Sequence, residues 1–342
     1  MENCSIIFSK NRIAMKRLLI NDELREIAKD YKKSMAKKFR AKPVDKLETL
    51  KGKLDATNDA DEIAYIQHII DNYDEIIMLD PDQFDKYQED YFDKGNINKT
   101  IVKKVVNKNT KEEKEHEMKL HEAIVECMRY TDVRDKIYPE LFYRLNLRTC
   151  PYCNAQYLVT VERKTGLKGT YQLDHGYPKS KYPWLCTTFF NLVPSCSSCN
   201  QAKGNDDKVD YKFYTSNPKE LYPFSFVLNK ASIIRYLLYQ DEKVLSVELK
   251  PMEVRLAGYE KAFGINSLYS SFNDVIEEIV WKSRIYNDSF KKNIKASLGR
   301  SFPYSGDFAR FITGNYTDRK DILKRPLALL VGDISRQLRV IF

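Results

Sequence analysis

The chain has 342 residues, of which 43% are hydrophobic and 31% are charged, a composition typical of a globular protein with a core of its own. Glycine and proline number only 12 each, which argues against long flexible linkers and favours helix. No apolar run approaches the roughly 20 residues that a membrane-spanning helix needs, and residues 1–12 lack a signal-peptide pattern. We therefore expect a cytoplasmic protein that does not act on a membrane.

The formal net charge is +9. A basic excess favours binding to nucleic acid, because lysine and arginine neutralise phosphates and release their counterions. Lysine-rich helices of ordinary cytosolic proteins have the same balance, so charge alone leaves both interpretations open.

Residues 1–147 are expected to be mainly helical, because apolar residues recur three or four positions apart in three stretches. The sequence TNDADE at 57–62 offers N-cap residues for the second helix. Residues 79–100 are rich in turn-forming residues and are expected to be a turn-rich connection. The recurring apolar residues are Leu24, Ile27, Tyr31 and Met35, then Ile63, Ile66, Ile70, Tyr73 and Ile77, and finally Leu120, Ile124 and Met128.

The composition changes near Asn146, after which short strand patterns appear. Residues 156–161 and 169–173 are expected to pair as a hairpin around the turn KTGLK. Further along, the expected strands are 224–228 and 244–250, and the expected helices are 253–264, 272–296 and 327–340. The expected fold is mainly α, and α+β overall, with three regions: 1–147, 148–210 and 211–342.

The central region contains two cysteine pairs, CPYC at Cys150 and Cys153 and CSSC at Cys196 and Cys199. In a reducing compartment such pairs are typical of metal sites rather than disulfides. Thiolates at this spacing can bind one tetrahedral Zn²⁺, so two pairs make a closed site that leaves no position for substrate. The sequence therefore predicts a structural zinc. A thioredoxin-like redox pair is the alternative, but the doubled pattern and the missing βαβ pattern count against it.

Between the pairs lies YQLDHGYPKSKYPWLCTTFFNLVP, and the second pair opens SCSSCNQAKGN. Residues 148–208 resemble the HNH (ββα-metal) endonuclease family. Its pattern is a strand ending in Asp-His, a Pro-x-Ser loop, an Asn at the second strand, and a helix carrying Asn or His before a Lys. Cysteine pairs that bracket this core are a known variant, so the resemblance implies a small central ββα module stapled by zinc. The matching residues are Asp174, His175, Pro178, Ser180, Asn191, Asn200 and Lys203.

The resemblance implies roles in phosphodiester hydrolysis for these residues. His175 is implied to be the general base, which suits an imidazole with an ordinary pKa of about 6.5. Asp174 and Asn200 are implied to hold a catalytic cation, and their oxygen atoms suit Mg²⁺ or Mn²⁺. Asn191 is implied to brace the loop of the histidine. Gln172, on the same strand face as Asp174, is a weaker candidate for the outer shell of the cation.

Three lysines of this region, Lys179, Lys181 and Lys203, are expected to contact nucleic-acid phosphates. More loosely, the whole layout resembles the PtuB-like HNH subunits of bacterial Septu anti-phage systems, which work with an SMC-like or ABC-type ATPase. This wider resemblance implies a bacterial defence endonuclease that acts on DNA and whose helical flanks bind an ATPase partner. The same flanks also fit ordinary amphipathic packing.

Two other functions fit the same residues. One is a zinc-stapled nucleic-acid-binding module without catalysis. The other is an HNH nuclease that acts on RNA, because a ββα-metal site contacts phosphates rather than base edges.

Overall fold

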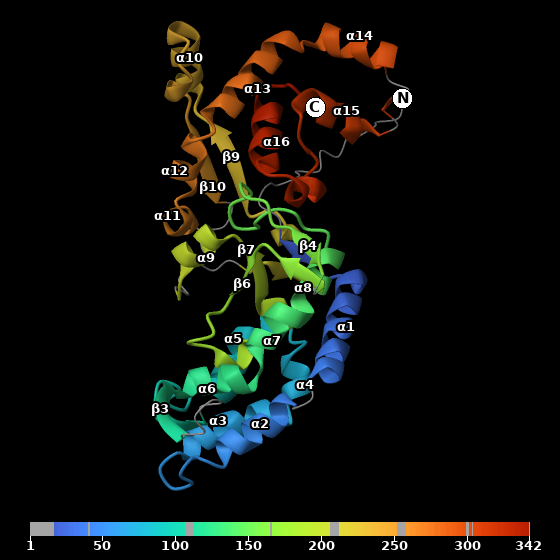
Figure 1. Ribbon diagram of the computed structural model, residues 1–342. Coiled ribbons are helices and arrows are strands. Elements are labelled where there is room, and N and C mark those ends of the chain that lie inside the picture. The colour runs from blue at the N-terminus through green and yellow to red at the C-terminus, as the bar shows by residue number, and fades with distance from the viewer. Residues whose placement is uncertain are drawn as a thin grey trace, which may run out of the picture. The chain divides into compact units, whose positions relative to one another are not determined.

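The structure is a computed structural model that describes residues 17–39, 42–106, 113–164, 166–205, 212–251, 258–298, 301–302 and 304–341 (Figure 1). Helices predominate in these ranges, and the strands described there form two-stranded sheets. This confirms the predicted mainly α, α+β fold. None of the described helices is both long and apolar enough to cross a membrane.

The contacts group the chain into two compact units. The N-terminal unit comprises residues 18–148 and 158–216, and the C-terminal unit comprises the described residues of 1–17, 149–157 and 217–342. The division into regions 1–147, 148–210 and 211–342 remains a prediction.

The N-terminal unit is a set of helices around short sheets. Its α-helices are α1 (Asp22–Lys38), α2 (Pro43–Lys51), α3 (Ala60–Asp71), α4 (Tyr73–Ile76), α5 (Phe84–Tyr87), α6 (Leu120–Cys127), α7 (Tyr130–Asp132), α8 (Tyr138–Arg144) and α9 (Ser197–Lys203). The paired strands are β1 (Leu18–Leu19) with β8 (Tyr214–Thr215), β2 (Thr100–Val106) with β3 (Glu113–Lys119), β4 (Thr160–Arg163) with β5 (Gly166–Gly169), and β6 (Gln172–His175) with β7 (Leu192–Ser195).

Helix α1 forms where its apolar period predicts it. The side chain of Asn21 accepts a hydrogen bond from the Leu24 N–H at 2.9 Å and so caps the helix. Leu24, Ile27, Tyr31 and Met35 are all buried, as expected of one amphipathic face. The predicted second and third helices are also confirmed, as α3 with α4 and as α6.

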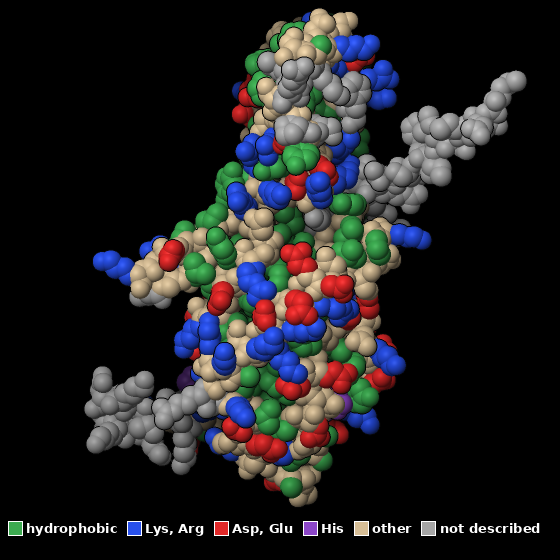
Figure 2. All heavy atoms as spheres, turned by 90° about the vertical axis from the view of Figure 1, so that its right-hand side faces the viewer, with side chains coloured by type: hydrophobic (Ala, Val, Ile, Leu, Met, Phe, Trp, Pro, Cys, Tyr) green, Lys and Arg blue, Asp and Glu red, His purple; other side chains and the backbone are tan. Residues whose placement is uncertain are grey.

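Figure 2 faces the side on which α1 lies in Figure 1, and it shows basic and acidic side chains intermixed there. Lys33 and Arg144 both pair with Asp30, and Lys29 pairs with Glu26. Because acids accompany these cations, α1 presents a solvated face of mixed charge rather than a basic tract.

Two local predictions for this unit are wrong. The predicted turn-rich connection 79–100 is instead helical over residues 81–92, because Phe84 and Phe92 are buried and anchor α5 and the π-helical turn that follows it. Bends and turns follow only over residues 93–98. The hairpin before the Asp-His pair joins β4 to β5, so its turn comes earlier than predicted, and residues 172–173 already belong to β6.

The C-terminal unit packs α16 (Ala328–Gln337) against a two-stranded sheet, β9 (Phe224–Leu228) with β10 (Val247–Pro251). The predicted strand 224–228 is confirmed, whereas the predicted strand 244–250 begins later because residues 242–244 form a 3-10 turn. The predicted helix 272–296 is two helices, and part of the predicted helix 253–264 lies outside the described residues. The other helices of the unit are α10 (Lys230–Tyr239), α11 (Tyr259–Phe263), α12 (Ile265–Ser270), α13 (Asn273–Ile285), α14 (Asp288–Leu298) and α15 (Ser305–Thr313).

Candidate functional site

The residues that match the HNH pattern lie on β6 (Asp174, His175), on α9 (Asn200, Lys203) and in the loop between β6 and β7 (Pro178, Ser180, Asn191), where Asn191 ends a 3-10 turn just before β7. The order β6, β7, α9 is the strand–strand–helix order that the resemblance implies. Strands β6 and β7 are antiparallel, with Asp174 opposite Val193 and His175 opposite Leu192. Helix α9 follows β7 directly, and Cys196 is its N-cap. The loop that joins the two strands runs from Gly176 to Asn191.

Asn191 closes this loop with three hydrogen bonds of its buried amide. Its Oδ1 accepts from the Tyr177 N–H at 2.7 Å, and its Nδ2 donates to the carbonyls of Tyr177 at 3.1 Å and Leu185 at 3.0 Å. A Cβ on Gly176 would lie 3.2 Å from the Asn191 Oδ1, so glycine permits the close approach. Asn191, at the end of the loop, therefore holds the start of the loop at Tyr177 and its middle at Leu185 in place near His175.

Replacing Asn191 with aspartate is expected to destabilise the protein by about 2–4 kcal/mol, because a carboxylate accepts but cannot donate to two buried carbonyls. Chemical denaturation measures this loss. Ser198→Ala, an exposed substitution on α9, is the control and should change stability by less than about 0.5 kcal/mol. Equal stability of Asn191→Asp and wild type would contradict the bracing role.

His175 is 5% exposed, and its Nε2 lies 3.0 Å from the carbonyl oxygen of Cys186. A carbonyl only accepts, so Nε2 carries the hydrogen and Nδ1 keeps its lone pair. Burial, helped by the positive charge of Lys179, lowers the pKa of His175 to about 3. The imidazole is therefore neutral at physiological pH and Nδ1 keeps a lone pair, but the lowered pKa makes the ring a weaker base than the ordinary histidine expected from the sequence.

Asp174 and Lys203 form a buried ion pair, with 3.2 Å between Asp174 Oδ2 and Lys203 Nζ. The same ammonium donates to the carbonyl of His175 at 2.6 Å. Lys203 is only 2% exposed, so this position does not fit the phosphate contact expected for it. Its charge is used inside the protein, where it orients Asp174 and fixes α9 to the end of β6.

Replacing Lys203 with methionine is expected to destabilise the protein by about 3–5 kcal/mol, because it removes the cation from beside a buried carboxylate. Added Mg²⁺ should restore part of this stability if Asp174 holds a cation. Urea unfolding with and without Mg²⁺ measures both effects. Lys181→Met, at an exposed lysine of the loop, is the matched control. If Lys203 contacted only phosphate, Lys203→Met would leave the stability of the free protein unchanged.

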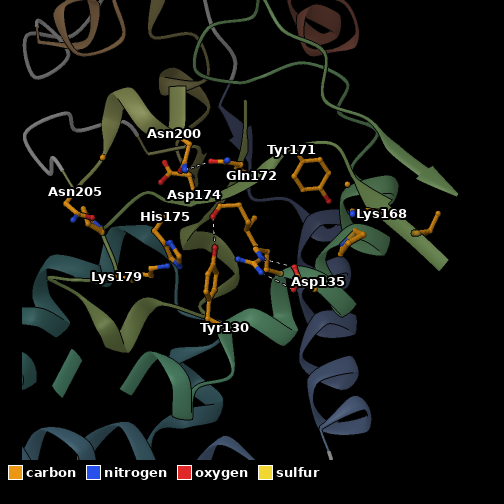
Figure 3. A pocket seen from close by; sticks show the side chains of 17 residues that line it. Tyr130, Asp135, Lys168, Tyr171, Gln172, Asp174, His175, Lys179, Asn200 and Asn205 are labelled. Carbon is orange, nitrogen blue, oxygen red and sulfur yellow. Dashed lines mark hydrogen bonds and ion pairs between the residues drawn. The ribbon is translucent and has the colours of Figure 1, made fainter. Parts of the chain in front are cut away.

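Asn200, the first residue after the second cysteine pair, lies beside Gln172. Its Nδ2 donates to the Oε1 of Gln172 at 2.5 Å, which directs the amide nitrogen toward Gln172 and leaves Oδ1 as the acceptor for another ligand. Figure 3 shows this bond and the Asp174 side chain next to it. The sequence placed Gln172 on the Asp174 face of the strand, and the structure gives it this positioning contact.

The predicted catalytic residues Asp174, His175 and Asn200 line one cleft of about 850 Å³ (Figure 3). Asn191 is not among the lining residues and bonds instead to the loop that follows His175. Lys179 lines the same cleft, and Lys181 lies on the exposed part of the loop. Three of the four predicted catalytic residues thus line the cleft, and of the three predicted phosphate contacts the structure buries only Lys203.

The four cysteines of the two pairs are buried, and their sulfur atoms all lie within 4.8 Å of one another. No disulfide is present among the described cysteines. A closed set of four sulfur ligands is consistent with a structural zinc site. The second pair starts α9: the Cys196 Sγ accepts a hydrogen bond from the Cys199 N–H at 3.5 Å.

The turn after the first pair is held by Asn154, which sequence reasoning missed. It is fully buried in the left-handed region, with φ 50°, where asparagine is tolerated better than most residues. Its side chain donates to the Ile322 carbonyl at 2.8 Å and accepts from the Leu329 N–H at 3.0 Å. The only feature of the sequence that could have indicated this turn is the position of Asn154 directly after CPYC.

The residues before 148 also support the loop of the candidate site, a role the sequence did not reveal. They form hydrogen bonds with backbone groups of the loop and β6 and with the side chains of Thr188 and Trp184. The pairs are Tyr31 Oη with Thr187 O at 2.5 Å, Tyr130 Oη with Leu173 O at 2.6 Å, Thr188 Oγ1 with Ile76 O, Phe189 N with Ile77 O, and Trp184 Nε1 with Gln88 Oε1, the last three at 2.9 Å.

No family model matches the chain, and neither does any curated protein or solved structure. The resemblance to HNH nucleases therefore rests on the motif residues and on their positions in the fold.

Proposed function

We propose that this protein is an HNH-type endonuclease that hydrolyses phosphodiester bonds in DNA with the help of a divalent cation. The observation that carries the proposal is the cleft in which Asp174, His175 and Asn200 meet, with the His175 tautomer fixed by the Cys186 carbonyl. A surface histidine beside a turn would have no reason to be buried and oriented in this way.

The donor set of the cleft fits a hard cation. Asp174 supplies a carboxylate and Asn200 an amide oxygen, and Mg²⁺ and Mn²⁺ prefer such oxygen donors. The Lys203 ammonium lies beside one carboxylate oxygen, Oδ2. When bound, such a cation supplies Lewis-acid stabilisation of the negative charge that develops on the phosphate.

The chain's own residues supply the proton transfer. Nδ1 of His175 accepts a proton from a water molecule, the water oxygen attacks phosphorus, and the bond from phosphorus to the leaving oxygen breaks. The leaving alkoxide then takes a proton from solvent. Asn191 keeps the loop beside His175 in place, and the buried Nε2–H bond to Cys186 holds the ring while the proton moves.

Cleavage of supercoiled plasmid tests the proposal. The protein is dialysed against EDTA, assayed without metal, and assayed again after addition of Mg²⁺ or Mn²⁺. Nicking or linearisation that requires the added cation supports the proposal. Binding in a gel-shift assay without cleavage under any cation would instead support a binding module, and cleavage of tRNA in preference to plasmid would reassign the substrate to RNA.

We further propose that the nuclease works in bacterial anti-phage defence with an SMC-like or ABC-type ATPase partner. In the C-terminal unit, α10 exposes Ile234, Leu238 and Tyr239, each at least 61% exposed, and exposed apolar residues on one helix favour protein binding. Co-purification with the product of a neighbouring ATPase gene tests the partner, and Leu238→Asp should weaken it if α10 contributes.

A further inference from the structure

We propose that Tyr130 is a positioning residue of the nuclease site, whose ring holds the Lys179 ammonium and the His175 imidazole where a substrate phosphate binds. The inference rests on the proposed function, and it assigns to that site a residue from outside the HNH motif.

Tyr130 reaches the site because the chain turns sharply before it. Arg129, between α6 and α7, has φ 61°, a left-handed conformation that a residue with a Cβ adopts only at a cost. Its guanidinium bonds to Asp132 at 2.9 Å and lies 4.8 Å from the centre of the Phe39 ring. These contacts hold a turn that aims Tyr130 at the end of β6.

Tyr130 makes three contacts with residues that line the cleft, and one of them is with the predicted general base His175. Its hydroxyl donates to the carbonyl of Leu173, the residue before Asp174, at 2.6 Å. Its ring centre lies 4.6 Å from that of His175 and 4.5 Å from the Nζ of Lys179. Figure 3 shows the Tyr130 ring beside His175, with Lys179 next to the imidazole. The tyrosine itself is 5% exposed.

The Lys179 ammonium is held by the ring rather than by an acid. No ion pair of Lys179 is present among the described residues, and desolvation lowers the pKa of this lysine. A carboxylate would hold the ammonium but neutralise it, whereas an aromatic face attracts a cation and leaves its full charge for a phosphate. Arg134, in the same cleft, is by contrast paired bidentately with Asp135 at 2.7 and 3.0 Å.

Two substitutions isolate the ring. Tyr130→Phe and Tyr130→Met both remove the hydroxyl, but only phenylalanine keeps an aromatic face, while methionine fills similar volume. The affinity of the full, zinc-loaded chain for a labelled DNA duplex is measured by fluorescence anisotropy over a KCl series without added divalent cation. Tyr31→Phe is the control, because Tyr31 also supports the loop but contacts neither His175 nor Lys179 in the described hydrogen bonds and ring pairs.

We expect Lys179→Met to reduce the salt slope by about 1, the loss of one phosphate contact. Tyr130→Met should reduce the salt slope by the same amount, and the double variant Tyr130→Met/Lys179→Met should reduce it no further. Tyr130→Phe and Tyr31→Phe should leave the salt slope unchanged. With Mg²⁺, cleavage by Tyr130→Met should fall at least about tenfold and that by Tyr130→Phe less than threefold.

An unchanged slope for Tyr130→Met, or effects that add in the double variant, would overturn the inference while leaving the nuclease intact. Failure of the wild type to cut any nucleic acid would instead remove the proposed function, and the slopes would still report whether Tyr130 positions Lys179. If Tyr130→Met does not fold, ¹³C-lysine NMR of the wild type decides. The ε-methylene signal lost in Lys179→Met must be shifted by the ring, and an unshifted signal would overturn the inference.

Discussion

Replacement of His175 by alanine is expected to reduce the rate of DNA cleavage by about 10²–10⁴-fold, the usual contribution of a general base. The imidazole is neutral, its Nε2 is committed to the Cys186 carbonyl, and Nδ1 is the nitrogen left to accept a proton. No neighbouring side chain of the HNH motif can substitute, because Asp174 is paired with Lys203 and Asn191 is an amide. Plasmid nicking with Mg²⁺ gives the rate.

The control for this variant is His116→Ala, which removes an exposed histidine of β3. It should cut like the wild type. Both variants should retain zinc, and His175→Ala should lose only about 1–3 kcal/mol of stability from the unpaired Cys186 carbonyl. Cleavage by His175→Ala at the wild-type rate, with zinc retained, would remove the histidine from the mechanism.

Much of the candidate site could be predicted from the sequence because the motif residues are close together in the chain. An Asp-His pair at the end of a strand and an asparagine after a cysteine pair are patterns of adjacent residues, and β6 and α9 carry them as expected. The period of α1 was equally readable, since one face of a helix repeats every three to four residues.

The errors come from burial, which adjacent residues do not specify. The sequence Lys203-Gly204 has the appearance of an exposed helix end, yet the lysine is buried against Asp174. Residues 79–100 have a turn-rich composition, but two buried phenylalanines accompany a helical segment over residues 81–92. Tyr130 lies far from the motif in sequence, so only the folded chain shows that it contacts His175.

Loss of zinc is the second large effect that we expect. Cys196→Ser should abolish tight zinc binding and lower the melting temperature by at least about 10 °C. The reason is that a structural zinc site forms only in the folded chain, so the free energy of zinc binding, about 10–16 kcal/mol in small zinc modules, stabilises the fold. Elemental analysis should find one zinc per wild-type chain and less in the variant, and thermal unfolding measures the stability. Cys127→Ser is the matched control, since this half-buried thiol lies outside the cluster and donates to the Lys46 carbonyl.

The same substitution should also abolish cation-dependent cleavage, for a reason that stability alone does not give. Cys196 is the N-cap of α9, and this helix carries Asn200 and Lys203. Without the zinc, the start of the helix loses its anchor, so the amide of Asn200 and the ammonium of Lys203 lose their positions beside Asp174. Assays well below the melting temperature of the variant separate the two effects. A folded Cys196→Ser protein that binds no zinc but cuts at the wild-type rate would show that the nuclease site does not depend on the metal.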